Sequence, residues 1–113
     1  MERNRQPNAC RQMSVVEAAW IGAMLEAEGC CIWYDNNGSR TVRATIVNTD
    51  PEIMSACLRL TQTGRVTGLL RERHRLCFHW NLNPWNSVQS FLGQVAPYSM
   101  KAQVALKEMD NRA

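Results

Sequence analysis

The order of helix and strand signals constrains the fold of this chain of 113 residues more than any other feature of its sequence. A helical segment followed by a hairpin occurs twice in succession, and further helical sequence follows. Short connections between such elements favour antiparallel strands, with the helices collected on one face of the sheet. The pattern therefore predicts an α+β fold of αββαββα order with a four-stranded, antiparallel, curved sheet.

Local signals place these elements along the chain. Ser14 and Glu17 form a capping box, and Gly29 ends the helix that this box opens. Asn36-Asn37-Gly38 is a strong hairpin signal. The predicted strands cover residues 30–35, 40–48, 65–70 and 76–82. The predicted helices cover 15–28, 51 to before Gly64 (with Thr49 and Glu52 as a possible second capping box), 84 to before Pro97, and 99 to about 109.

The rest of the chain organisation is simple. The polar residues 1–13 lack periodicity and predict a flexible N-terminal arm, and 14–113 predict a single domain. No apolar run approaches the roughly 20 residues of a membrane span, and the N-terminal sequence lacks a secretory signal, so we expect no membrane partner. Five cysteines without a C-x-x-C pair predict small buried thiols in a reducing cytoplasm, or in an organellar matrix if an organelle encodes the chain.

Charge is unevenly distributed along the chain. The formal net charge is +3, and 11 of the 13 basic residues are arginine. Residues 59–75 hold five arginines and one acid, whereas residues 14–28 hold three acids and no base. Arginine favours bidentate contacts to phosphate or guanine, so an anionic partner is one interpretation. A solvated charged face is an equally good one.

The first predicted helix carries small residues at helical spacing. Ala18, Ala19, Gly22, Ala23 and Ala27 form this stripe. Gly22 costs roughly 1 kcal/mol of helix propensity relative to Ala, which a close contact between helices would explain. Glu26 and Glu28 stand at the C-terminal end, where the helix dipole disfavours carboxylates and predicts a neighbouring cation. An ordinary buried helix with a solvated last turn explains the same residues.

The segment Ile21-Gly-Ala-Met-Leu-Glu-Ala-Glu-Gly29 resembles the LAGLIDADG nonapeptide of homing endonucleases and their relatives. The resemblance extends over about residues 14–106 and matches single-motif members of the family. It includes Trp20, Asn48-Thr-Asp-Pro-Glu52, Trp80, Phe91-Leu-Gly-Gln-Val-Ala-Pro97-Tyr98, Lys101 and Gln103.

This resemblance implies a mechanism. One motif per chain implies a homodimer whose motif helices pack on Gly22, Ala23 and Ala27. Glu28 would then be the metal ligand, and two copies would hold Mg²⁺, for which Mn²⁺ would substitute. The resemblance also gives Lys101 and Asn48 supporting roles in catalysis. The spacing of Lys101 from Pro97 is one residue shorter than is usual in the family. Asn48 equally suits a structural role at the corner between the sheet and the next helix. Glu26 is expected to be structural.

Strand alternation and the same resemblance select the residues that would contact DNA. They are Ile32, Tyr34, Asn36, Ser39, Thr41, Arg43, Thr45, Arg65, Thr67, Arg71, Arg75 and His79.

The resemblance thus implies a homodimeric, site-specific endonuclease of double-stranded DNA, cutting a long, nearly palindromic site and leaving short 3′ overhangs. A non-cleaving nucleic-acid-binding protein on the same scaffold is the alternative, either an intron RNA maturase or a DNA-binding regulator. A purely structural interaction domain is a third interpretation, which the outward arginines disfavour. The sequence leaves open the target site, the host element and which arginines read bases.

Overall fold

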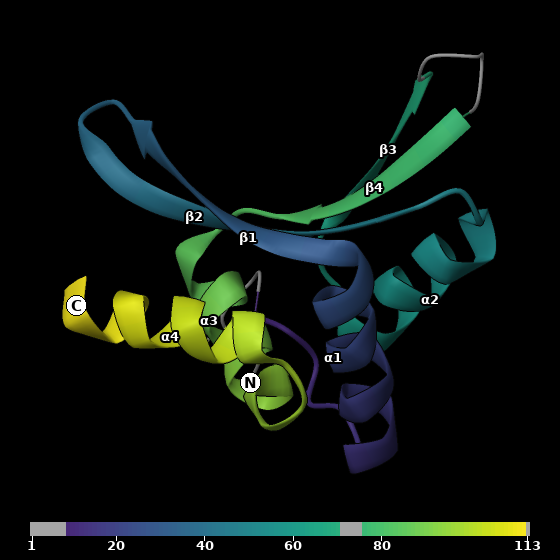
Figure 1. The fold of residues 1–113 in the computed structure, drawn as a ribbon, viewed down its shortest axis with the longest axis horizontal. Helices are drawn as coiled ribbons and strands as arrows, with labels where there is room; N and C mark the ends of the chain where they lie inside the picture. Colours follow the sequence, from purple (N-terminus) through teal and green to yellow (C-terminus); the bar gives the residue numbers. More distant parts are fainter. Residues whose placement is uncertain (1–8, 71–75, 113) are drawn as a thin grey trace, which may run out of the picture.

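The computed structural model describes residues 9–70 and 76–112 and has the predicted α+β architecture (Figure 1). In chain order the elements are α1 (Val15–Glu28), β1 (Gly29–Asn36), β2 (Ser39–Asn48), α2 (Pro51–Thr61), β3 (Arg65–Leu70), β4 (Leu76–Leu82), α3 (Trp85–Val95), the 3₁₀ turn η3 (Ala96–Tyr98) and α4 (Met100–Arg112). None of the described helices is long and apolar enough to cross a membrane. The Arg71 and Arg75 predictions lie outside the described residues.

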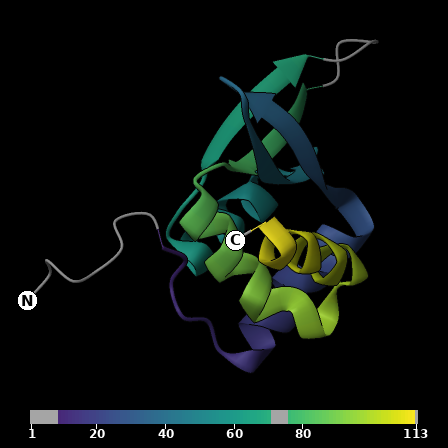
Figure 2. The same ribbon diagram turned by 90° about the vertical axis from the view of Figure 1, so that its left-hand side faces the viewer.

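The four strands form one antiparallel sheet in the order β1-β2-β4-β3. Both hairpins rise away from the helices, so the sheet forms a trough whose open side carries no helix (Figures 1 and 2). The predicted curved sheet with its helices on one face is therefore confirmed. The turn between β1 and β2 uses Asn37 and Gly38 with positive φ angles, as a tight hairpin requires.

The core lies between the sheet and the helices. Trp80 of β4 is fully buried, packs edge-on against Phe91 of α3 with ring centroids 5.1 Å apart, and donates its indole N–H to the Thr63 carbonyl. Burial of an indole with its N–H bonded satisfies both its apolar body and its polar atom. Ile21 and Leu25 bring α1 into the same core.

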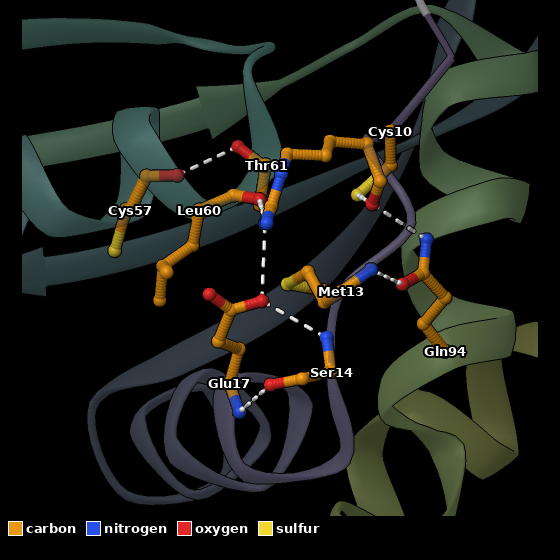
Figure 3. A network of polar contacts seen from close by, with 9 residues as sticks. Cys10, Met13, Ser14, Glu17, Cys57, Leu60, Thr61 and Gln94 are labelled. Carbon is orange, nitrogen blue, oxygen red and sulfur yellow. Dashed lines mark hydrogen bonds and ion pairs between the residues drawn. The ribbon is translucent and has the colours of Figure 1, made fainter.

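The end of the predicted arm is ordered rather than flexible. Cys10 and Met13 are buried, and the Arg11 N–H donates to the Thr61 carbonyl at 2.8 Å. Gln94 accepts from the Met13 N–H and donates to the Arg11 carbonyl (Figure 3). These bonds tie the segment to α2 and α3, which no periodicity in the sequence could indicate. Residues 1–8 of the predicted arm lie outside the described residues.

The helix caps are partly as predicted. The Ser14 and Glu17 capping box is present, with both reciprocal hydrogen bonds formed. At α2 the prediction of Thr49 as the cap is wrong, because Asp50 accepts from the Glu52 N–H instead. Asp50 is adjacent to Pro51, the first residue of the helix, so it occupies the capping position that Thr49 would have needed.

Candidate nucleic-acid interface

Strand pairing assigns each residue of the sheet to one of two faces. Ile32 pairs with Arg43, Tyr34 with Thr41, and Asn36 with Ser39, all on the open side of the trough. Trp33 pairs with Val42 on the helix side, where Val42 is fully buried. The register therefore confirms the predicted alternation. On the open face β3 and β4 add Arg65, Thr67 and His79, as predicted, together with Asn81, which sequence reasoning missed.

Arg43 on this face is held by specific neighbours. The Arg43 guanidinium lies over the Tyr34 ring, 5.1 Å from its centroid, and its Nε donates to the Asn83 Oδ1 at 3.0 Å. Arg65, Asn81 and Asn83 line a polar pocket of about 320 Å³ at the start of β3. Stacked and hydrogen-bonded arginines lose less side-chain entropy when they bind a phosphate or a base edge.

Two polar atoms near the middle of this face have no partner among the described residues. They are Thr45 Oγ1 and His79 Nε2, which lie diagonally across the β2–β4 pair. Thr45 is on the predicted face, but it is only 4% exposed, so the prediction of a direct DNA contact there needs correction. Its neighbours on β1 and β4, Cys30 and Asn81, flank it on the same row and leave the hydroxyl covered.

The C-terminal end of α1 meets the sheet beside β2. A Cβ on Gly29 would lie 2.3 Å from the Thr45 carbonyl oxygen, so only glycine permits this approach. Glu28 precedes it and is exposed, and no hydrogen bond or ion pair from the described part of the chain reaches its carboxylate. Its carboxylate is therefore open to a ligand.

Lys101 is the cation that the dipole of α1 predicts near the C-terminal end of this helix. Its Nζ donates to the Gly29 carbonyl at 2.8 Å, at the very end of α1. Glu26, one turn earlier than this carbonyl, accepts from the Ser99 hydroxyl and from the Lys101 N–H. These two bonds lower the pKa of Glu26, the Lys101 backbone bond contributing most. The structural role expected of Glu26 is thus evident.

Asn48 stands at the sheet corner, two residues beyond the Ile46 that pairs with Gly29. Its Oδ1 accepts from the Asp50 N–H at 2.9 Å and shapes the turn into α2. The side chain is therefore engaged in local structure. This geometry favours the structural interpretation of Asn48 over the catalytic one.

The small-residue stripe of α1 divides between two environments. Gly22 is buried, and a Cβ there would lie 2.9 Å from the Tyr98 Cβ and 3.4 Å from the Val95 Cβ. Gly22 therefore serves packing within its own chain, a correction to its assignment at a contact between chains. Ala23 and Ala27 are exposed, together with Val16 and Trp20 on the same side of the helix.

Among the described residues, no group of three or more His, Cys, Asp or Glu side chains gathers in an arrangement that could hold a metal ion. Glu28 alone supplies one carboxylate. Oxygen ligands suit Mg²⁺, which keeps several waters, so the donor type fits but one chain does not complete a site.

Comparison with known proteins decides what this architecture resembles. No family model and no curated protein matches the sequence. Among solved structures, the homing endonuclease I-CvuI bound to its target in the presence of Ca matches 85% of this chain and 67% of its own, with a TM-score of 0.67 and 16% identity. The chain has the fold of a homing endonuclease.

A second structure of I-CvuI agrees with this assignment. In it the enzyme is bound to the I-CreI target with Mg, and the DNA is not cleaved. It matches 84% of this chain and 66% of its own, with a TM-score of 0.64 and 18% identity. This chain thus matches about two thirds of the length of these neighbours.

Proposed function

We propose that this chain is a homodimeric, divalent-metal-dependent endonuclease that cuts double-stranded DNA at a specific site. The observation that carries the proposal is the placement of Glu28, which is exposed and has no hydrogen-bond or ion-pair partner among the described residues. It directly precedes β1, the edge strand of a sheet whose open face carries Arg43, Arg65, Thr67 and His79. The two I-CvuI structures described above were both solved in complex with a DNA target. A curved, basic β-ribbon fits the major groove of DNA.

A second copy completes the site in this proposal. The exposed stripe of Val16, Trp20, Ala23 and Ala27 is apolar, and its alanines allow two helix backbones to approach closely. A two-fold axis along this stripe brings two Glu28 carboxylates together. Mutual repulsion of like charges at that distance requires cations between them.

The chain's own groups divide the work. The two Glu28 carboxylates would hold Mg²⁺, or Mn²⁺ in its place, against the scissile phosphates. Such ions activate a water and stabilise the leaving oxygen in phosphodiester hydrolysis. Lys101 places an ammonium group beside the same helix end and stabilises charge on the phosphate. The arginines of the open face bind the DNA backbone and bases, so binding weakens as salt rises.

Cleavage in the presence of different metals tests the proposal. Binding selection from randomised duplexes supplies a target, which is then placed in a supercoiled plasmid. We expect linear plasmid with Mg²⁺, tight binding without cutting with Ca²⁺, and at least about a 100-fold slower cutting by Glu28→Gln, since that change keeps shape and removes charge. Glu52→Gln, at an exposed position of α2, is the matched control and should cut normally.

The outcomes separate the candidate functions. Undiminished cutting by Glu28→Gln contradicts the metal-ligand role. Specific, salt-dependent binding with no cutting under any metal identifies a non-cleaving maturase or DNA-binding regulator instead. Absence of salt-dependent binding to DNA or RNA rejects both.

A further inference from the structure

The C-terminal end of α1 and the N-terminal end of α4 share one carboxylate. Glu26 Oε1 accepts from the Ser99 hydroxyl at 2.9 Å and from the Lys101 N–H at 3.0 Å. The Ser99 Oγ in turn accepts from the Ala102 N–H at 3.1 Å, which caps the first turn of α4. Ser99 is only 2% exposed, so water does not compete for its hydroxyl. We call these three groups the Glu26 clamp: the Glu26 carboxylate, the Ser99 hydroxyl and the Lys101 N–H.

The clamp holds the main chain of Lys101, whose side chain extends toward the Glu28 end of α1. Lys101 Nζ donates to the Gly29 carbonyl at 2.8 Å, directly after Glu28 in the chain. A lysine side chain has four rotatable bonds and loses about 2 kcal/mol of rotamer entropy when it is held in place. Fixing its backbone is therefore a large part of fixing where its ammonium group can go.

We propose that Glu26 is a positioning residue, which sets the Lys101 ammonium beside the Glu28 end of α1 through Ser99 and the Lys101 main chain. This inference rests on the proposed function for its effect on cleavage. The side-chain hydrogen bonds of Glu26 to the described residues go to Ser99 and Lys101, and none goes to Glu28 or to the open face of the sheet. Its role is carried entirely by α4.

Electrostatics favour a carboxylate at this junction. Glu26 sits in the last turn of α1, where the helix dipole disfavours it, and against the first turn of α4, where the dipole favours it. Hydrogen bonds to an ionised carboxylate are roughly twice as strong as those between neutral groups.

A double-mutant cycle on single-turnover cleavage is the decisive experiment. We expect Glu26→Ala to slow cleavage by about tenfold or more while DNA affinity changes less than about twofold. Glu26→Gln should slow it less, because an amide oxygen still accepts both hydrogen bonds. In a Lys101→Ala background, adding Glu26→Ala should cost no further rate, because the clamp acts through Lys101.

A spectroscopic readout keeps the inference independent of cleavage. Lys101 and Lys107 are the only two lysines in the sequence, so selectively ¹³Cε-labelled lysine gives two side-chain signals. We expect Glu26→Ala to move the Lys101 signal toward that of Lys107, which lies on the same helix and has no hydrogen bond or ion pair among the described residues. Ser99→Ala should move the Lys101 signal in the same direction, and this second variant replaces Glu26→Ala in the test if Glu26→Ala does not fold.

Glu52→Ala is the control for both measurements, because it removes an exposed helix glutamate elsewhere and should change neither the cleavage rate nor the Lys101 signal. The inference is overturned if Glu26→Ala slows cleavage equally with and without Lys101, or if the Lys101 signal stays in place in both clamp variants. If the wild-type protein cuts no DNA, the proposed function fails, and the NMR signals alone decide whether the clamp holds Lys101.

Discussion

Each end of α1 carries a glutamate that accepts hydrogen bonds, but the two glutamates serve different purposes. At the N-terminal end, Glu17 accepts from the Ser14 N–H and from the Arg11 guanidinium, which also binds the Leu60 carbonyl. At the C-terminal end, Glu26 accepts from Ser99 and Lys101. The first network closes on itself and joins helices. The second leaves Glu28 exposed beside a lysine, so stability and the candidate chemistry are built at opposite ends of one helix.

The stripe between the two ends should give the largest effect when it is altered. Ala23→Leu adds three carbon atoms to an exposed position at the proposed helix contact, so overpacking should abolish the dimer. Sedimentation velocity should report a monomer, and cleavage should be lost with it. Ser55→Leu, at an exposed position of α2, should leave the sedimentation coefficient unchanged. A dimer that survives Ala23→Leu places the interface elsewhere.

The C-terminal end should be far less tolerant of an added methyl group than an open helix position. In Gly29→Ala the new Cβ collides with the Thr45 carbonyl, 2.3 Å away, and we expect a loss of about 1–3 kcal/mol of unfolding free energy. Gly93→Ala in α3 meets nothing within 4 Å and should raise stability by up to about 1 kcal/mol. Urea unfolding measures the unfolding free energy of both variants. Equal changes would show that the backbone near Gly29 shifts to accommodate the added methyl group.

Breaking the N-terminal end should cost stability but not chemistry. Ser14→Ala removes the hydroxyl that accepts from the Glu17 N–H, and we expect a loss of about 1 kcal/mol. Single-turnover cleavage by the folded variant should remain normal. A slowed cleavage step in Ser14→Ala would contradict the separation between the two ends.

Both ends should respond to acid in the same direction. Hydrogen bonds lower the pKa of Glu17, chiefly from the Ser14 N–H, and that of Glu26, chiefly from the Lys101 N–H. A lowered folded-state pKa means that the unfolded chain binds more protons, so this stabilisation is complete above the ordinary value of 4.5 and is lost as pH falls below it. Thermal unfolding between neutral and acid pH should show a weaker pH dependence in Glu17→Gln and in Glu26→Gln.

Thiol labelling should give the smallest but clearest contrast between the ends. Burial raises the pKa of Cys10, beside the N-terminal network, to about 11. Cys30, just after the C-terminal end, is exposed. Maleimide should therefore modify Cys30 first, as mass spectrometry of the native protein can show. Preferential labelling of Cys10 would mean that the N-terminal network opens readily.

Patterns that repeat within a few residues were predictable. The Ser14 capping box and the Asn-Gly turn are local, and strand alternation placed Arg43 and Thr67 on the open face because side chains alternate with period two. Expectations that depend on packing were less accurate. The sequence predicts Gly22 at a contact between chains, whereas in the structure it packs against Val95 and Tyr98 of its own chain. A stripe of small residues does not by itself indicate which neighbour packs against it. The thiols were expected to be buried, yet Cys30 lies on the open face.

The sequence by itself determined the order of the helices and strands, the face of the sheet to which each strand residue points, and the position of Glu28 at the end of a helix. Each of these depends on hydrogen bonds and periodicities within a few residues. Only the tertiary structure decided that Arg11 and Gln94 hold the N-terminal segment, and that Ser99 and Lys101 meet Glu26. Those partners lie more than 70 positions apart in the chain. Nothing in local spacing encodes such meetings, since they arise when α3 and α4 fold back against α1.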